Sequence, residues 1–379
     1  MRELLDQMHD WWSTGEPAGL ATVVGTFKSA PRAPGAAMVV GPRGAVAGSV
    51  SGGCVEGAVY ELAGDVVASG VPKLTRYGVS DDDAFTVGLT CGGVIDIFVE
   101  RVDRERWPWL PELAEAVRTG SPVAVVTVIA SPDRERPGAH RVVWPDRADG
   151  TLGSDRIDDA VTDDARGLLA AGRSSALEYG PDGQRRGEGL RVFVNSFAPR
   201  PRLLVFGAID YAAAVARIGS FLGYRVTVCD ARGVFATPQR FPGADEVVVD
   251  WPHRYLAAEV EAGRVDRRAV VTVLTHDPKF DVPLLEVALR LDLAYVGAMG
   301  SRRTHDDRRK RLREAGLTDA ELAGLSSPIG LDLGARTPEE TAVSVAAEII
   351  ALRWGGGGER LSAVEGPIHH PARSPVKQD

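Results

Sequence analysis

The pattern of apolar residues along the chain changes near residue 200. Before this point, short β-branched runs are separated by glycine and proline, a pattern typical of strands joined by turns. After it, apolar runs alternate regularly with helical patterns, and the proline-containing stretch 195–201 separates the two regions. We therefore predict an N-terminal domain over 1–195, a linker over 196–201, a second domain over 202–354 and a flexible tail over 355–379.

The first region combines strands and helices without strict alternation, which favours an α+β domain. Apolar residues at helical spacing indicate helices at 55–69, 110–117 and 157–171. Strands are predicted at 20–24, 36–40, 94–99, 123–129 and 190–194.

The second region has the order expected of a doubly wound fold. Fully apolar strands followed by helices predict a parallel sheet covered on both faces, which is a Rossmann-like domain. The predicted strands are 203–206, 225–229, 246–249, 269–274 and 294–296, and the predicted helices are 208–222, 282–291, 302–315 and 338–353.

Composition narrows the class of protein. The 379 residues carry a net charge of −8, which argues against a broad nucleic-acid surface, although a small anionic ligand could still bind locally. Three cysteines argue against a disulfide framework and for a reducing compartment. We find no secretory signal and no apolar run of membrane-spanning length, so we expect a cytoplasmic protein. The 43 glycines predict many tight loops.

The turn after the first strand of the second domain resembles a dinucleotide-binding turn, but it is altered. Gly207 and Ala212 match the first and last positions of G-x-G-x-x-G/A, whereas Ile209 replaces the middle glycine that lets backbone approach a pyrophosphate. Asp230 follows the second strand, where an acidic residue usually binds a ribose hydroxyl. The crevice is thus a candidate nucleotide site. The alternative is a scaffold in which Asp230 caps a turn.

Two further loops are candidates for phosphate or cofactor binding. Ser301 can cap the helix that follows Gly300, and Arg302 and Arg303 in its first turn would favour a bound anion. The alternative is a solvated basic helix with interleaved acidic residues. The second loop precedes a predicted capping box at 337–340 and contains Gly330, Asp332, Gly334 and Arg336, which the capping box alone does not explain.

The first domain contains two cysteines, each beside a pair of glycines. Gly52, Gly53 and Cys54 precede the helix at 55–69, where a helix N-terminus can favour a thiolate. Cys91 and Gly92 lie before the strand at 94–99. Both cysteines are candidate reactive thiols and ligand contacts. The alternative is that they are small buried apolar residues. Their spacing does not favour a protein zinc site, so no directly bound metal is predicted.

These motifs together resemble the xanthine dehydrogenase accessory factor family, which is also described with the CO dehydrogenase maturation factors (XdhC/CoxI). The resemblance covers nearly the whole chain. The segments that carry it are GSVSGGCVE, GLTCGG, RLLVFGA, VTVCDAR, LTHDPKFD, YVGAMGSRR, SPIGLDLGARTPEE and GPIH.

The resemblance implies a maturation role rather than xanthine dehydrogenase activity itself. Such factors bind molybdenum cofactor, as molybdopterin or its cytosine dinucleotide form, and support its sulfuration with a cysteine desulfurase. They then deliver it to an apo molybdenum hydroxylase, and they form homodimers. We expect the cysteines to face the molybdenum and the second domain to hold the phosphate, with the cofactor between the domains. The alternatives are an NAD(P)-dependent oxidoreductase and an adaptor that binds the hydroxylase without cofactor.

Overall fold

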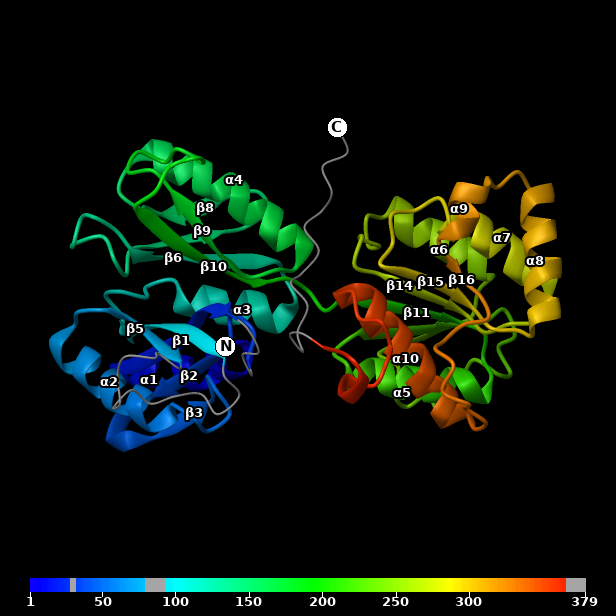
Figure 1. The fold of residues 1–379 in the computed structure, drawn as a ribbon, viewed down its shortest axis with the longest axis horizontal. Coiled ribbons are helices and arrows are strands. Elements are labelled where there is room, and N and C mark those ends of the chain that lie inside the picture. The colour runs from blue at the N-terminus through cyan, green and yellow to red at the C-terminus, as the bar shows by residue number, and fades with distance from the viewer. Residues whose placement is uncertain (28–31, 79–92, 366–379) are drawn as a thin grey trace. The chain divides into compact units, whose positions relative to one another are not determined.

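The computed structural model describes residues 1–27, 32–78 and 93–365. The chain divides into two compact units, Met1–Pro199 and Arg200–Asp379. In Figure 1 the colours run from blue to green through the first unit and from green to red through the second.

The first unit is built on two antiparallel sheets, each of five strands in its described residues. Their orders are β3-β2-β1-β5-β4 and β8-β7-β6-β10-β9. The strands of the first sheet are β1 (Ala18–Phe27), β2 (Ala37–Val40), β3 (Val46–Gly48), β4 (Lys73–Gly78) and β5 (Val94–Val102). Those of the second are β6 (Val123–Ala130), β7 (His140–Val143), β8 (Ala148–Gly150), β9 (Ser175–Tyr179) and β10 (Leu190–Phe197).

The two sheets face each other, and helices cover their outer faces. Val24 and Phe98 of one sheet pack against Ile129 and Phe193 of the other. Helix α2 (Glu56–Ser69) covers the outer face of the first sheet, and α4 (Asp155–Ala171) covers that of the second, as Figure 1 shows. Helices α1 (Leu5–Thr14) and α3 (Leu110–Thr119) complete a core shared by both sheets. The predicted α+β architecture is confirmed.

The second unit contains an all-parallel sheet that is six-stranded within the described residues. Its order is β13-β12-β11-β14-β15-β16, which is the 3-2-1-4-5-6 order of a Rossmann fold, so this prediction is also confirmed. The strands are β11 (Arg202–Phe206), β12 (Arg225–Cys229), β13 (Glu246–Val248), β14 (Val270–Val273), β15 (Tyr295–Ala298) and β16 (Leu325–Ser326).

Helices cover both faces of this sheet (Figure 1). One layer consists of α5 (Asp210–Phe221) and α10 (Pro338–Trp354), which contact each other. The other consists of α6 (Pro252–Glu261), α7 (Pro278–Ala288), α8 (Arg302–Glu314) and α9 (Asp319–Ala323). Each helix of the described residues is too short or too polar to cross a membrane.

The structure differs from the predicted elements at several ends, and it also contains elements that were not predicted: α1, α6, α9, β3, β4, β7, β8, β9 and β16. Strand β10 continues to Phe197 because this side chain is buried in the core of the first unit. Helix α7 begins at Pro278 rather than at 282, because Asp277 caps it by accepting a hydrogen bond from Lys279 N. Helix α6 was not predicted. Only part of its length is apolar, although Tyr255 and Leu256 pack into the core.

Candidate functional site

The segment of residues 48–55, here called the glycine–cysteine loop, is wound around the carboxylate of Glu56. Glu56 Oε1 accepts hydrogen bonds from Ser49 Oγ at 2.7 Å, Ser51 N at 2.9 Å and Gly52 N at 3.0 Å. Glu56 Oε2 accepts from Ser51 Oγ at 2.5 Å and Gly53 N at 2.8 Å. One side chain therefore accepts hydrogen bonds from most of the N–H and hydroxyl donors of the loop.

Cys54 is half-buried at the end of this loop. Its N–H donates to Ser51 Oγ at 3.0 Å, and α2 begins two residues later, at Glu56. Gly52 and Gly53 are exposed and have φ values of +81° and +124°, which glycine adopts readily. Among the described residues, no atom lies within 4 Å of a Cβ built at either glycine.

The surroundings of the Glu56 carboxylate lower its pKa. Partial burial opposes its ionisation, but hydrogen bonds from the Ser51 and Ser49 hydroxyls and from Ser51 N outweigh that effect and hold the pKa of Glu56 well below its ordinary range. The carboxylate that binds the loop therefore stays ionised at acidic pH values where an ordinary glutamate is protonated.

This lowered pKa predicts how the stability of the protein responds to pH. Because the folded-state pKa lies below the unfolded value, the contribution of Glu56 is complete above about pH 4–5 and is lost as the pH falls further. The difference in unfolding free energy between the wild type and Glu56→Gln should thus be constant from neutral pH down to that range and then shrink. Urea unfolding of both proteins across the range measures it. A difference that grows in acid would contradict this assignment.

Cys91 and Gly92 lie outside the described residues, as does the terminal GPIH segment. Their part in a ligand site stays a prediction.

The glycine turn of the second unit lies directly after β11. Gly207 has φ +115°, and a Cβ there would lie 2.9 Å from Thr275 Cγ2 and 3.0 Å from Thr275 N. Glycine is therefore required at this position by both backbone conformation and space. Ile209 is extended and packs against the core, and α5 starts at Asp210 without a side-chain cap. The acidic Asp210 thus occupies the helix end where a pyrophosphate would approach in the usual fingerprint.

Asp230 holds this turn in place. Its carboxylate accepts a hydrogen bond from Ala208 N at 2.7 Å and two from the guanidinium of Arg232, at 2.9 and 2.8 Å. Burial opposes ionisation of Asp230, whose exposed fraction is only 1%, yet these hydrogen bonds lower its pKa. A ribose hydroxyl would have to share or replace the contacts with Arg232, so that role stays a prediction.

The loop between β15 and α8 forms the basic part of the candidate site. Ser301 caps α8 by accepting from Thr304 N at 3.1 Å, as predicted. Arg302 and Arg303 are exposed in the first turn. Neither side chain forms an ion pair or hydrogen bond among the described residues, in contrast to Arg311 further along α8, which pairs with Asp307. Two cationic side chains at a helix N-terminus are thus available to an anion.

A buried ion pair beneath this loop was missed by the sequence analysis. Arg308 Nη2 donates to Asp281 Oδ2 at 3.0 Å and to the carbonyl of Met299 at 2.8 Å, and Arg308 Nη1 donates to Ser327 Oγ at 3.0 Å. Both charged side chains are almost fully buried, and Thr275 also donates to Asp281. The pair ties α7 and α8 to the loops after β15 and β16. The spacing in the sequence could have indicated that Arg308 is buried, since it precedes the buried Leu312 by one helical turn and so lies on the same face of the helix.

The loop after β16 is anchored to α10. Gly330 N donates to Glu348 Oε2 at 2.7 Å, and with φ +98° a Cβ there would lie 2.4 Å from Ser344 Oγ. The predicted capping box at 337–340 is confirmed. Asp332, Gly334 and Arg336 are exposed. Because all strands of the sheet are parallel, this loop and those after β11, β12, β14 and β15 lie at the same carboxyl edge, where Rossmann ligands bind.

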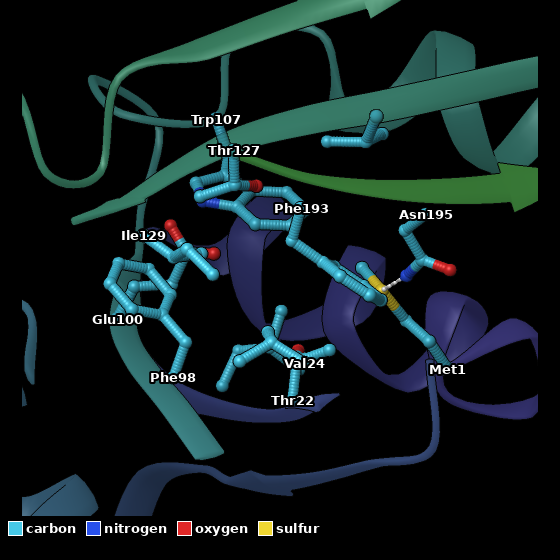
Figure 2. A pocket seen from close by; sticks show the side chains of 12 residues that line it. Met1, Thr22, Val24, Phe98, Glu100, Trp107, Thr127, Ile129, Phe193 and Asn195 are labelled. Atoms are coloured by element: carbon cyan, nitrogen blue, oxygen red, sulfur yellow. Dashed lines mark hydrogen bonds between the residues drawn. The ribbon is translucent and has the colours of Figure 1, made fainter. Parts of the chain in front are cut away.

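A small cavity between the two sheets of the first unit lies apart from these predicted residues (Figure 2). It offers about 10 Å³ to the centre of a water-sized sphere, which is room for one water. Glu100, Thr127 and Asn195 are among its polar lining residues. The buried Nε1 of Trp107, which also lines it, has no hydrogen-bond partner among the described residues. Of the predicted ligand-binding residues that the structure describes, none lines this cavity.

Comparison with known protein families identifies the two units. Residues 203–349 match the XdhC Rossmann domain, and residues 11–78 and 116–180 match the XdhC and CoxI family. The chain belongs to the XdhC and CoxI family, as its motifs predicted.

Individual relatives match nearly the full length. A protein from Bacillus subtilis described as a probable xanthine dehydrogenase subunit is 29% identical over 89% of this chain and 94% of its own. A molybdenum cofactor insertion chaperone, PaoD, from Escherichia coli is 26% identical over 90% of this chain and 85% of its own. A solved structure described as a xanthine dehydrogenase from Bacillus halodurans covers 96% of this chain and 97% of its own, with 25% identity and a TM-score of 0.68.

Proposed function

We propose that this protein binds molybdenum cofactor as cargo and delivers it to an apo molybdenum hydroxylase of the xanthine dehydrogenase type. The observation that carries the proposal is the glycine–cysteine loop, which holds the half-buried Cys54 on a hydrogen-bonded turn next to the exposed Gly52 and Gly53. Thiolates are preferred ligands of soft metal centres. The full-length similarity to a molybdenum cofactor insertion chaperone supports the same role.

In this proposal each unit supplies its own candidate contacts to the cofactor. Cys54, together with Cys91 and Gly92, contacts the molybdenum end and supports its sulfuration by a cysteine desulfurase partner. The carboxyl edge of the second unit takes the phosphate, or the dinucleotide if the cargo is the cytosine form. The exposed Arg302 and Arg303 and the N-terminus of α8 fit a phosphate.

The second unit fits conventional NAD(P) chemistry less well. Ile209 fills the position of the middle glycine, Asp210 places a negative charge at the start of α5, and the Asp230 carboxylate already binds Arg232. Each of these features works against the usual contacts of a pyridine dinucleotide. We therefore expect weak NADH binding compared with molybdenum cofactor, which competitive titration measures.

The phosphate assignment makes a further prediction. Replacing Arg302 and Arg303 together by alanine should weaken molybdopterin binding about tenfold, because charge-assisted hydrogen bonds to phosphate are lost. Raising the salt concentration should weaken the wild type more than the variant. Isothermal titration at two ionic strengths measures both effects. Lys310→Ala is the matched control, since Lys310 is exposed further along the same helix. Equal loss in the control and the double variant would contradict a specific phosphate site.

A further inference from the structure

The strongest feature that the proposed function leaves unexplained is the convergence of the glycine–cysteine loop on one carboxylate. We propose that Glu56 is a positioning residue that holds this loop in the shape in which Cys54 meets the cofactor. The inference rests on the proposed function of Cys54, and its test separates the two.

Val50 and Val55 are buried in the core of the first unit, so apolar packing holds the loop at these two positions. The turn between them depends on polar contacts. Gly52 and Gly53 are exposed, and neither has a side chain that could pack. Glycines also give an unfolded or loosened loop the largest conformational freedom. The Glu56 carboxylate restricts this freedom by accepting hydrogen bonds from two hydroxyls and five backbone N–H groups. The hydroxyls are those of Ser49 and Ser51, and the N–H groups are those of Val50, Ser51, Gly52, Gly53 and Val55.

Ser51 links the carboxylate to the cysteine. The Ser51 hydroxyl donates to Glu56 Oε2 at 2.5 Å, which orients its oxygen to accept from Cys54 N at 3.0 Å and Val55 N at 3.1 Å. Charge-assisted hydrogen bonds of this kind are stronger than neutral ones. The backbone position of Cys54 thus depends on Glu56 through a single intermediate residue.

The same contacts explain why a phosphate is not expected to bind here. A glycine-rich turn leading into a helix is ordinarily an anion site, because its N–H groups point at the ligand. In this loop those N–H groups already face an internal anion, the Glu56 carboxylate. The loop is therefore suited to present a thiol rather than to bind phosphate.

Hydrogen exchange of the loop amides tests the positioning role without cofactor. In Glu56→Ala, the peptide covering the loop should exchange at least about tenfold faster than in the wild type, because hydrogen bonds to a charged group are lost. Added formate or acetate, which restores a carboxylate to the vacated space, should recover part of the protection. The control Glu61→Ala removes an exposed carboxylate from the same helix and should leave the loop unchanged. Glu56→Gln, which keeps the side-chain volume, serves if the alanine variant folds poorly.

The molybdopterin content of the same proteins tests the functional consequence. We expect Glu56→Ala and Cys54→Ala to lose cofactor alike, and formate or acetate to restore binding only to Glu56→Ala. Unchanged exchange in both Glu56 variants would overturn the positioning role. Faster exchange with full cofactor content in Glu56→Ala, alongside loss in Cys54→Ala, would also overturn it while leaving the proposed function intact. Full content in Cys54→Ala would instead overturn the role of the cysteine.

Discussion

Replacing Cys54 by alanine is expected to lower the molybdopterin content of the purified protein by at least about tenfold. Groups that only orient metal ligands already contribute about tenfold or more to metal affinity, and a contacting thiol should contribute no less. The substitution should lower cofactor binding without unfolding the protein, because Cys54 lies half-buried at the end of a loop rather than at the centre of a core. Adding Cys91→Ala should lower the content further. The molybdopterin content is measured by oxidising the pterin to a fluorescent product.

Cys229→Ala is the matched control for this experiment. Cys229 is buried in β12, and burial, together with the charges of Asp250 and Asp230, raises its pKa to about 12. It is therefore a neutral thiol at physiological pH and should be inert. Cofactor content should stay at the wild-type level in this variant. If the Cys54→Ala protein contains as much cofactor as the control, Cys54 is not part of the binding site.

Replacing Arg308 by alanine is expected to cause the largest loss of stability among these substitutions. It would leave the Asp281 carboxylate buried without its cation, and breaking a buried pair in this way typically costs about 3–5 kcal/mol. The carbonyl of Met299 and the hydroxyl of Ser327 would also lose a donor. Because these groups belong to the loops after β15 and β16, phosphate binding should weaken together with stability. Urea unfolding measures the first effect and titration the second.

Arg311→Ala is the control for the ion pair, since Arg311 pairs with Asp307 on the exposed side of the same helix. Exposed pairs contribute little, so this variant should unfold at nearly the wild-type urea concentration. The double variant Asp281→Asn with Arg308→Met removes both charges and should recover part of the loss, because no unpaired charge remains buried. An Arg308→Ala protein as stable as the control would show that the pair does not hold these loops.

The sequence predicted the regular parts of the fold because they depend on local patterns. Strand β12 has its predicted bounds, 225–229, and the Ser301 and Thr337 caps were visible as residue types at fixed spacing. Helix α5 was predicted to start two residues early, at 208 rather than Asp210, because the extended backbone of Ile209 is set by packing against the core.

The side-chain partners in the candidate site were harder to predict. Arg308 and Asp281 are 27 positions apart, and only the folded sheet brings α7 and α8 together. In the sequence, Arg308 therefore looks like the exposed arginines around it. Glu56 lies within seven positions of all its donors, so its role was in principle visible, as a serine-rich turn followed by an acid at the start of a helix. An acid there is also common as an ordinary capping residue, and the sequence does not distinguish the two roles.

Titration of the purified protein with molybdenum cofactor and, separately, with NADH tests the central claim most directly. The protein as isolated should contain organic phosphate and the absorbance of a pterin. After removal of that material, it should bind molybdenum cofactor stoichiometrically, bind NADH weakly, and restore activity to an apo molybdenum hydroxylase when loaded. Tight NADH binding without affinity for molybdenum cofactor would contradict the account and favour a pyridine-nucleotide enzyme.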